Sequence, residues 1–153
     1  MAYARNAATP GQVGRRSARP AKRATTLLLV EDEPSVRRTV RLMLESGGFN
    51  VIAAASGADA LAALAGSASP VQALVTDLNM PGMSGFDLVS HLLERGPAMD
   101  LPVLFISGQP APLPAHWPAT VPRRFLAKPF TLAQLLAEVQ AILPLRLAQQ
   151  SLP

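Results

Sequence analysis

The stretch ALVTDLNMPGMSG (residues 73–85) decides the fold that we expect of this chain. It begins as a short apolar run, which is typical of a strand buried on both faces of a parallel sheet. The run ends in the carboxylate of Asp77, and a Pro-Gly turn at 81–82 precedes a helix expected to begin near Ser84. Because ligands of open parallel sheets bind at the carboxyl ends of the strands, Asp77 is a candidate functional residue. The alternative is that Asp77 only caps a turn.

The composition indicates one globular domain. The chain has 153 residues, of which 49% are hydrophobic, and this is enough to form a core of its own. It has no cysteine, which excludes disulfides and thiolate metal sites. No apolar run approaches the ~20 residues of a membrane-spanning helix. We therefore expect a cytoplasmic protein without a membrane span.

Positive charge is concentrated at the amino terminus. Residues 1–24 hold six basic residues and no acid, whereas the rest of the chain holds eight basic and ten acidic residues. We predict a disordered basic tail over residues 1–24, a globular domain over 25–144 and a short carboxyl-terminal tail over 145–153. Contact of the basic segment with nucleic acid or anionic lipid, or a role as a transit peptide, are the alternatives.

Five apolar runs alternate with helical patterns along the globular part. We predict strands at residues 25–31, 51–55, 71–77, 101–107 and 124–128. We predict helices over residues 34–47, 56–66, 84–96 and 131–144, the last of them ended by Pro144. On the first helix, Arg37, Arg38 and Arg41 fall outside the apolar face. This alternation predicts a parallel sheet with helices on both faces.

The pattern breaks between the fourth and fifth predicted strands. Residues 107–122 contain five prolines, at positions 110, 112, 114, 118 and 122. A proline inside a helix costs ~3 kcal/mol, and no gap between these prolines exceeds one helical turn. We therefore expect the fourth helix to be missing or degenerate, and Trp117 to anchor the loop.

Polar residues gather at the carboxyl ends of the predicted strands. These strand-end residues are Glu31, Asp32, Asp77, Ser107 and Lys128. Strand ends of a parallel sheet share one edge, so the three carboxylates would repel one another by up to ~4 kcal/mol per pair. Such a cluster needs cations, and Lys128 with one divalent ion would balance the charge. Hard oxygen ligands without His or Cys favour Mg²⁺.

A metal, a lysine and a hydroxyl around one carboxylate form a phosphoryl-binding arrangement. The metal would neutralise charge on a transferred phosphoryl group, and Lys128 would hold its oxygens. Asp77 would be the nucleophile and would become an aspartyl phosphate. A reactive acyl phosphate suits a transient signal.

Four segments of the chain resemble the receiver (response regulator) domain of bacterial two-component signalling. They are LLLVEDEP (27–34), TDLNMPGMSG (76–85), FISG (105–108) and AKPF (127–130). The resemblance covers residues 25–144 in the order typical of the family. It implies a flavodoxin-like, doubly wound α/β fold with a five-stranded parallel sheet of order 2-1-3-4-5.

The resemblance also implies a role for each matching residue. Asp77 matches the phosphoacceptor, and Asp32, Asp77 and the backbone carbonyl of Asn79 match the direct Mg²⁺ ligands. Glu31 matches the acid that acts through a metal-bound water. Further matches are Lys128 as the phosphate-contacting lysine, Ser107 as the switch hydroxyl and Phe125 as the switch aromatic. Glu33 aligns just outside the acid pair.

The resemblance implies a phosphorelay module that signals through protein contacts. The phosphoryl donor would be a histidine kinase or a phosphotransfer protein. The missing helix resembles receivers attached to hybrid histidine kinases and some lone receivers, so we expect a monomer or weak dimer without an effector domain. No helix-turn-helix or base-stacking array is present, so we expect no DNA binding.

Other readings remain as alternatives. An aspartyl-phosphate phosphatase would need a second carboxylate at position 79, where this chain has Asn79. A flavin-binding module would place phosphate where Glu31 and Asp32 repel it. A pseudo-receiver adaptor would keep the fold and act without phosphorylation. We expect no enzymatic activity beyond self-phosphorylation and aspartyl-phosphate hydrolysis.

Overall fold

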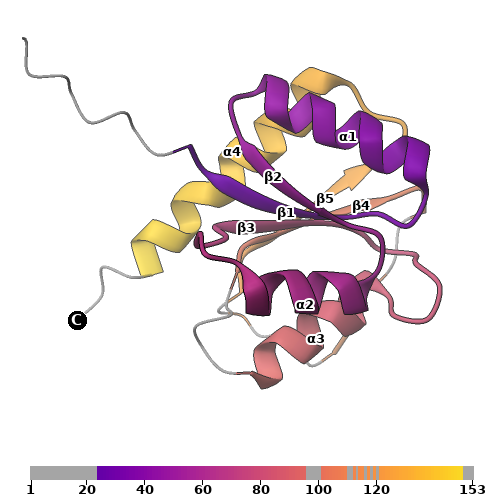
Figure 1. The fold of residues 1–153 in the computed structure, drawn as a ribbon, viewed down its shortest axis with the longest axis vertical. Helices are drawn as coiled ribbons and strands as arrows, with labels where there is room; N and C mark the ends of the chain where they lie inside the picture. Colours follow the sequence, from indigo (N-terminus) through magenta and orange to yellow (C-terminus); the bar gives the residue numbers. More distant parts are fainter. Residues whose placement is uncertain are drawn as a thin grey trace, which may run out of the picture.

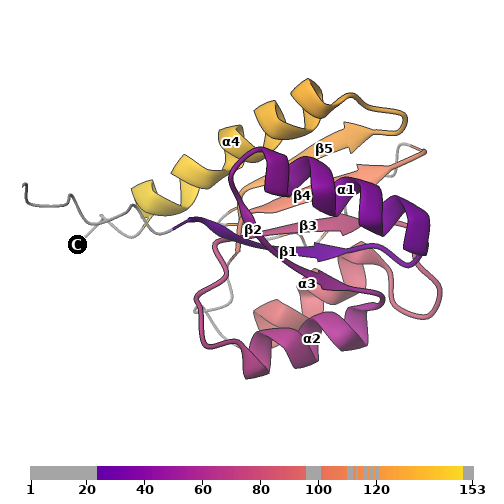
Figure 2. The same cartoon turned by 45° about the horizontal axis from the view of Figure 1, so that its top comes forward.

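The computed structural model describes residues 24–95, 101–109 and 121–149, together with 112, 114, 115, 117 and 119. Five strands form one parallel sheet in the order β2-β1-β3-β4-β5, which confirms the predicted order. The strands are β1 (Thr26–Val30), β2 (Asn50–Ala54), β3 (Ala73–Asp77), β4 (Val103–Ser107) and β5 (Arg123–Ala127). Their carboxyl ends all point to one edge of the sheet (Figure 2).

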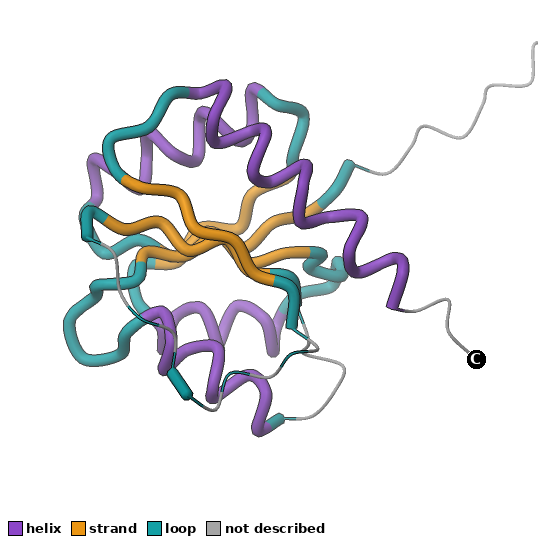
Figure 3. The backbone as a smooth tube through the Cα atoms, turned by 180° about the vertical axis from the view of Figure 1, so that it is seen from behind, coloured by secondary structure: helices purple, strands orange, loops and turns teal. Residues whose placement is uncertain are grey.

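Helices cover both faces of the sheet, as the alternating pattern predicts. They are α1 (Pro34–Ser46), α2 (Gly57–Gly66), α3 (Gly85–Glu94) and α4 (Leu132–Gln149). Helices α1 and α4 pack together on one face, and α2 and α3 pack together on the other (Figure 1). The view from behind shows the same three layers (Figure 3).

Two hydrophobic clusters hold these layers together. The central strands β1, β3 and β4 are buried at every position, because helices cover them on both sides. Alternate side chains point to opposite faces. Leu28, Leu74 and Phe105 therefore pack toward α3, whereas Leu27 and Leu104 pack toward α1 and α4.

The predicted helix starts are formed by side-chain caps. The Ser56 hydroxyl accepts a hydrogen bond from the Asp59 N–H at the start of α2. Ser84 and Asp87 form a reciprocal capping box at the start of α3. A cap satisfies N–H groups that have no partner within the helix, and so fixes where each helix begins.

The β4–β5 connection is the place where the fourth helix is predicted to be missing or degenerate. No helix occurs among its described residues. Trp117 packs edge-on against Phe86 and Phe105, with ring centroids 6.1 and 5.5 Å away. Its indole N–H donates to the Val121 carbonyl oxygen at 3.3 Å. Trp117 therefore anchors this loop on the α3 side of the sheet, as predicted.

The predicted end of the last helix is wrong. Helix α4 continues through Pro144 to Gln149. A proline removes one N–H donor and leaves the rest of the helix able to form hydrogen bonds. The following Leu, Arg, Ala and Gln residues favour helix, so the helix extends. The boundary predicted between the domain and a tail at 144–145 thus falls inside α4.

Two further expectations concern the amino-terminal segment and a membrane span. The predicted basic tail lies outside the described residues, except for Ala24. Within the described part of the chain, no helix is both long and apolar enough to cross a membrane.

Candidate functional site

The site lies at the edge of the sheet where the parallel strands end. Glu31 and Asp32 follow β1, Asp77 is the last residue of β3, Ser107 is the last residue of β4, and Lys128 follows β5. The structure thus places all five predicted strand-end residues at one edge. Their convergence follows from the parallel sheet order, because neighbouring strand ends lie side by side.

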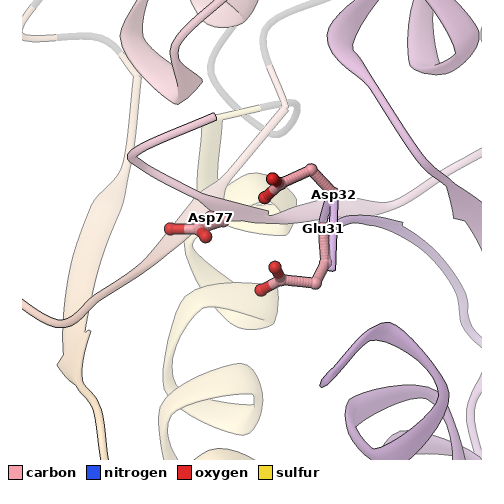
Figure 4. A group of neighbouring side chains, drawn as sticks. All are labelled: Glu31, Asp32 and Asp77. Atoms are coloured by element: carbon pink, nitrogen blue, oxygen red, sulfur yellow. The ribbon is translucent and has the colours of Figure 1, made fainter. Parts of the chain in front are cut away.

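Three carboxylates form a compact cluster at this edge. One carboxylate oxygen each of Glu31, Asp32 and Asp77 lie within 4.8 Å of one another (Figure 4). Glu31 is 3% exposed and Asp77 is 8% exposed, whereas Asp32 is half-buried. Carboxylates at this spacing repel one another strongly in a partly dry environment.

Lys128 supplies the compensating charge. Its Nζ donates to Glu31 Oε2 at 2.9 Å and to Asp77 Oδ2 at 3.2 Å. Burial lowers the pKa of Lys128, but hydrogen bonds to Glu31 and Asp77 outweigh burial and raise the pKa overall. Burial raises the pKa of Glu31, repulsion by Asp77 adds to the rise, and the Lys128 bond opposes it without cancelling it. One ammonium thus leaves negative charge in the cluster.

The Ser107 hydroxyl belongs to a polar network that Asn79 connects to Asp77. Asn79 donates its backbone N–H to Asp77 Oδ1 at 3.1 Å and its side-chain N–H to Ser107 Oγ at 3.3 Å. Ser107 Oγ also donates to the Gln109 carbonyl oxygen and accepts from the Gln109 N–H. The Asn79 side chain therefore links the turn after β3 to the end of β4.

The turn after β3 brings α3 against the Asp77 backbone. Gly82 has φ +80°, a conformation that glycine adopts without strain. A Cβ at Gly85 would lie 2.6 Å from the Asp77 carbonyl oxygen. The Gly85 N–H donates to the Leu78 carbonyl oxygen at 2.9 Å. Gly82 therefore permits the turn, and Gly85 permits the close approach of α3 to the Asp77 backbone.

Phe125 lies at an exposed position on β5. Its side chain is 43% exposed, and its ring stacks on Phe105 with centroids 5.2 Å apart. Phe105 is fully buried and is two residues before Ser107 on β4. The predicted switch aromatic is thus outward in this state and contacts the strand that carries the predicted switch hydroxyl.

Sequence reasoning missed two contributors next to the site. Arg37, predicted on the outer face of α1, donates to the carbonyl oxygens of Glu31 and Asp32 at 2.7 and 3.1 Å. Glu33, predicted only near the acid pair, accepts N–H bonds from Ser35 and Val36 and caps α1. The signal for Glu33 was its place directly before Pro34, whereas helical periodicity carried no signal for Arg37.

The donor set fits a hard divalent cation. The cluster offers carboxylate oxygens and contains no His or Cys. Among the described residues, the Asp32 carboxylate has no hydrogen-bond or ion-pair partner, so its oxygens are free to bind a cation. Mg²⁺ is bound by one or two carboxylates and keeps several waters, which matches this cluster.

Comparisons with known proteins agree with this geometry. The response regulator receiver domain model matches residues 27–140. The chain is 34% identical over 119 residues to the response regulator receiver protein CpdR of Brucella abortus (strain 2308), covering 76% of this chain and 95% of CpdR. It is 38% identical over 121 residues to the sensor kinase CckA of the same organism, covering 78% of this chain but only 13% of the kinase.

Solved structures show the same fold. A response regulator receiver protein from Sinorhizobium medicae WSM419 has 30% sequence identity and a TM-score of 0.65, over 80% of this chain and 96% of that one. A chemotaxis protein CheY4 from Vibrio cholerae has 26% identity and a TM-score of 0.66. The match over residues 27–140, together with the sheet order, shows that this chain belongs to the response regulator receiver domain family.

Proposed function

We propose that this chain is a phosphoacceptor module of a two-component phosphorelay, with Asp77 as the residue that is phosphorylated. The observation that supports this most is the position of the Asp77 carboxylate. It is buried at the strand end, and Lys128 on one side and the Asn79 N–H on the other bond its two oxygens. Two further acids lie within 4.8 Å. This arrangement holds a nucleophile among groups that bind a phosphoryl group and a cation.

The proposed reaction is a phosphoryl transfer to Asp77. One carboxylate oxygen of Asp77 donates an electron pair to the phosphorus atom of a phosphohistidine. The P–N bond breaks, and its electron pair returns to the histidine nitrogen of the donor. Asp32, Asp77 and the Asn79 carbonyl would hold Mg²⁺ directly and Glu31 would hold it through a water, and the ion would neutralise charge on the phosphoryl oxygens. Lys128 is placed to contact one of these oxygens, because it already contacts Asp77.

Switching would begin at Ser107. Phosphorylation adds negative charge and three acceptor oxygens at Asp77. The Ser107 hydroxyl, now bonded to Gln109, would instead donate to a phosphoryl oxygen. Movement of the β4 end would change the support that Phe105 gives to Phe125. We infer that the inward and outward positions of Phe125 are the two states that partner proteins read.

The partner and the location are further parts of this proposal. A histidine kinase or a phosphotransfer protein is the proposed donor, and a protein contact is the proposed output. We further propose a cytoplasmic monomer or weak dimer that does not bind DNA. The similarity to a lone receiver and to the receiver part of a sensor kinase supports either setting.

We infer that the chain is no enzyme beyond its own phosphorylation and the hydrolysis of its aspartyl phosphate. A phosphatase would need an acid/base two residues after the nucleophile. Asn79 stands there, and its side-chain amide bonds Ser107 instead. This observation disfavours the phosphatase alternative.

Intact-mass measurement tests the proposal. The wild-type protein is incubated with acetyl phosphate, with Mg²⁺ or with EDTA. We expect a gain of about 80 Da that needs Mg²⁺ and that is absent in Asp77→Asn. Asp59→Asn, an exposed acid on α2, is the matched control and should gain the same mass as wild type. A wild-type protein that gains no mass from acetyl phosphate or from any histidine kinase would leave only the pseudo-receiver reading.

A further inference from the structure

Arg37 holds the backbone of the acid pair. It lies in the first turns of α1, is half-buried, and donates from one guanidinium nitrogen to two carbonyl oxygens. The distances are 2.7 Å to the Glu31 oxygen and 3.1 Å to the Asp32 oxygen. Arg38, the next residue, is exposed and makes no such contact within the described part of the chain.

These carbonyls lie beyond the strand ladder. The pairing of β1 with β2 and β3 ends at Val30. The Glu31 N–H still donates to the Ala54 oxygen at 3.2 Å. Beyond that bond, the described strands offer no further partner to this backbone, and buried backbone groups need partners. Arg37 takes the place of a neighbouring strand for the two residues that carry carboxylates.

The Asp32 carboxylate depends on this backbone contact. The Glu31 carboxylate is held by Lys128 at one oxygen and by the Glu33 N–H at the other. By contrast, the Asp32 side chain has no partner among the described residues. Its position is therefore set by its backbone, and Arg37 bonds the Asp32 carbonyl oxygen of that backbone directly.

Helix α1 fixes Arg37 in turn. The Glu33 carboxylate caps the helix through the N–H groups of Ser35 and Val36. The Arg37 N–H donates to the Glu33 carbonyl oxygen at 2.9 Å. These bonds fix the start of α1, and the Arg37 guanidinium connects α1 to the backbone that follows β1.

We propose that Arg37 is a positioning residue for the divalent-cation site, orienting the Asp32 carboxylate through the backbone carbonyls that it binds. The inference rests on the proposed function, because it concerns the same cation. Groups that orient metal ligands without touching the metal typically change metal affinity by about 10- to 100-fold. Arg37 would act on cation binding, and it touches neither the phosphoryl group nor Asp77.

The sign of the effect separates positioning from simple charge. A guanidinium near an acidic cluster repels a divalent cation, so removing its charge alone should tighten Mg²⁺ binding. Loss of orientation should weaken Mg²⁺ binding. Positioning therefore predicts a change opposite to the one that electrostatics alone would give.

The test compares Mg²⁺ affinity among wild type, Arg37→Ala, Arg37→Gln and Arg38→Ala. Mg²⁺ is titrated into each protein without any phosphoryl donor, and the Asp32 and Asp77 amide resonances are followed by NMR. We expect Arg37→Ala to bind Mg²⁺ roughly tenfold more weakly. Arg37→Gln, which keeps an N–H donor without the charge, should recover part of the loss. Arg38→Ala removes the same charge and should bind as tightly as wild type or slightly more tightly.

The outcomes separate this inference from the proposed function. If wild type binds Mg²⁺ and Arg37→Ala binds it equally or more tightly, positioning by Arg37 is wrong while the cation site stands. If wild type does not shift at either aspartate, the proposed cation site itself is wrong. The metal-free amide spectrum of each variant shows whether it is folded, and an unfolded Arg37→Ala leaves Arg37→Gln against Arg38→Ala as the deciding pair.

Discussion

The buried negative charge of Glu31 destabilises the fold when no metal is bound. It is nearly fully buried, and burial followed by repulsion from Asp77 keeps its pKa raised despite the Lys128 bond. The folded state therefore binds this proton more tightly than the unfolded state. The stability from protonated Glu31 is present below 4.5, the ordinary pKa of a glutamate, and is lost as the pH rises through the folded pKa.

Glu31→Gln should therefore stabilise the metal-free protein at neutral pH. Glutamine removes the buried charge, but it has one acceptor oxygen and so keeps the bond from either Lys128 or the Glu33 N–H, which limits the gain. In EDTA at pH 7 we expect the free energy of unfolding to rise by roughly 1 kcal/mol, and the difference from wild type to shrink toward pH 4.5. Urea denaturation at several pH values measures this. Glu45→Gln, on the exposed side of α1, is the control. A less stable Glu31→Gln at pH 7 would contradict this argument.

Single residues at the site divide into those the sequence could predict and those it could not. Asp77 and Ser107 could be placed because a strand end fixes where its last side chain lies. Arg37 could not, because helical periodicity gives the direction in which a side chain leaves the axis and not how far it reaches back. The bond from Asn79 to Ser107 joins residues 28 positions apart, so no local pattern indicates it.

The start of α1 depends on the Glu33 cap. Hydrogen bonds from Ser35 and Val36 lower the pKa of Glu33, so its charged form stabilises the fold above 4.5, the ordinary pKa of a glutamate. That contribution is lost as the pH falls through the lowered pKa.

We expect Glu33→Ala to lower the melting temperature at pH 7 by more than Glu45→Ala does. Glu33 satisfies N–H groups of the first turn, whereas Glu45 only pairs with the exposed Arg41. Differential scanning calorimetry at pH 7 and at pH 3.5 measures both variants. The difference in melting temperature between the two variants should be smaller at pH 3.5 than at pH 7. An unchanged difference would show that Glu33 does not act as a charged cap.

The loop that replaces the fourth helix depends on Trp117. Trp117→Ala removes edge contacts with Phe86 and Phe105 and the cation–π contact with Arg123, whose Cζ is 5.6 Å from the indole. We expect the free energy of unfolding to fall by about 2 kcal/mol, which is less than for a fully buried tryptophan, because Trp117 is only half-buried. Leu42→Ala, 56% exposed on α1, should change stability by less than about 0.5 kcal/mol. Equal effects in urea denaturation would mean that Trp117 carries no anchoring role.

Elements were predicted to within one or two residues where caps and glycines mark their ends. Helix α1 begins at Pro34 and helix α2 ends at Gly66, as the sequence indicates. The proline-rich connection could also be predicted, because five prolines leave no room for a helix. The prediction that the last helix ends at Pro144 is wrong, because one proline in a run of helix-forming residues does not stop this helix.

In the molecule as a whole, the candidate site lies at one edge of the sheet, and the two hydrophobic clusters lie on the two faces of the sheet. Sheet order follows from alternating strands and helices, so the gathering of distant acids could be predicted. The outward position of Phe125 could not, since it depends on packing against Phe105 rather than on local sequence.

Identifying which residue carries the phosphoryl group is the most direct test of the central claim. After phosphorylation by acetyl phosphate and Mg²⁺, borohydride reduction converts an aspartyl phosphate to homoserine. Trypsin then separates Glu31 and Asp32, in the peptide 24–37, from Asp77 in the peptide 42–95. We predict homoserine at position 77 and an unmodified 24–37 peptide. Modification of Glu31 or Asp32, or none at Asp77 in a protein that has gained phosphate, would contradict the account.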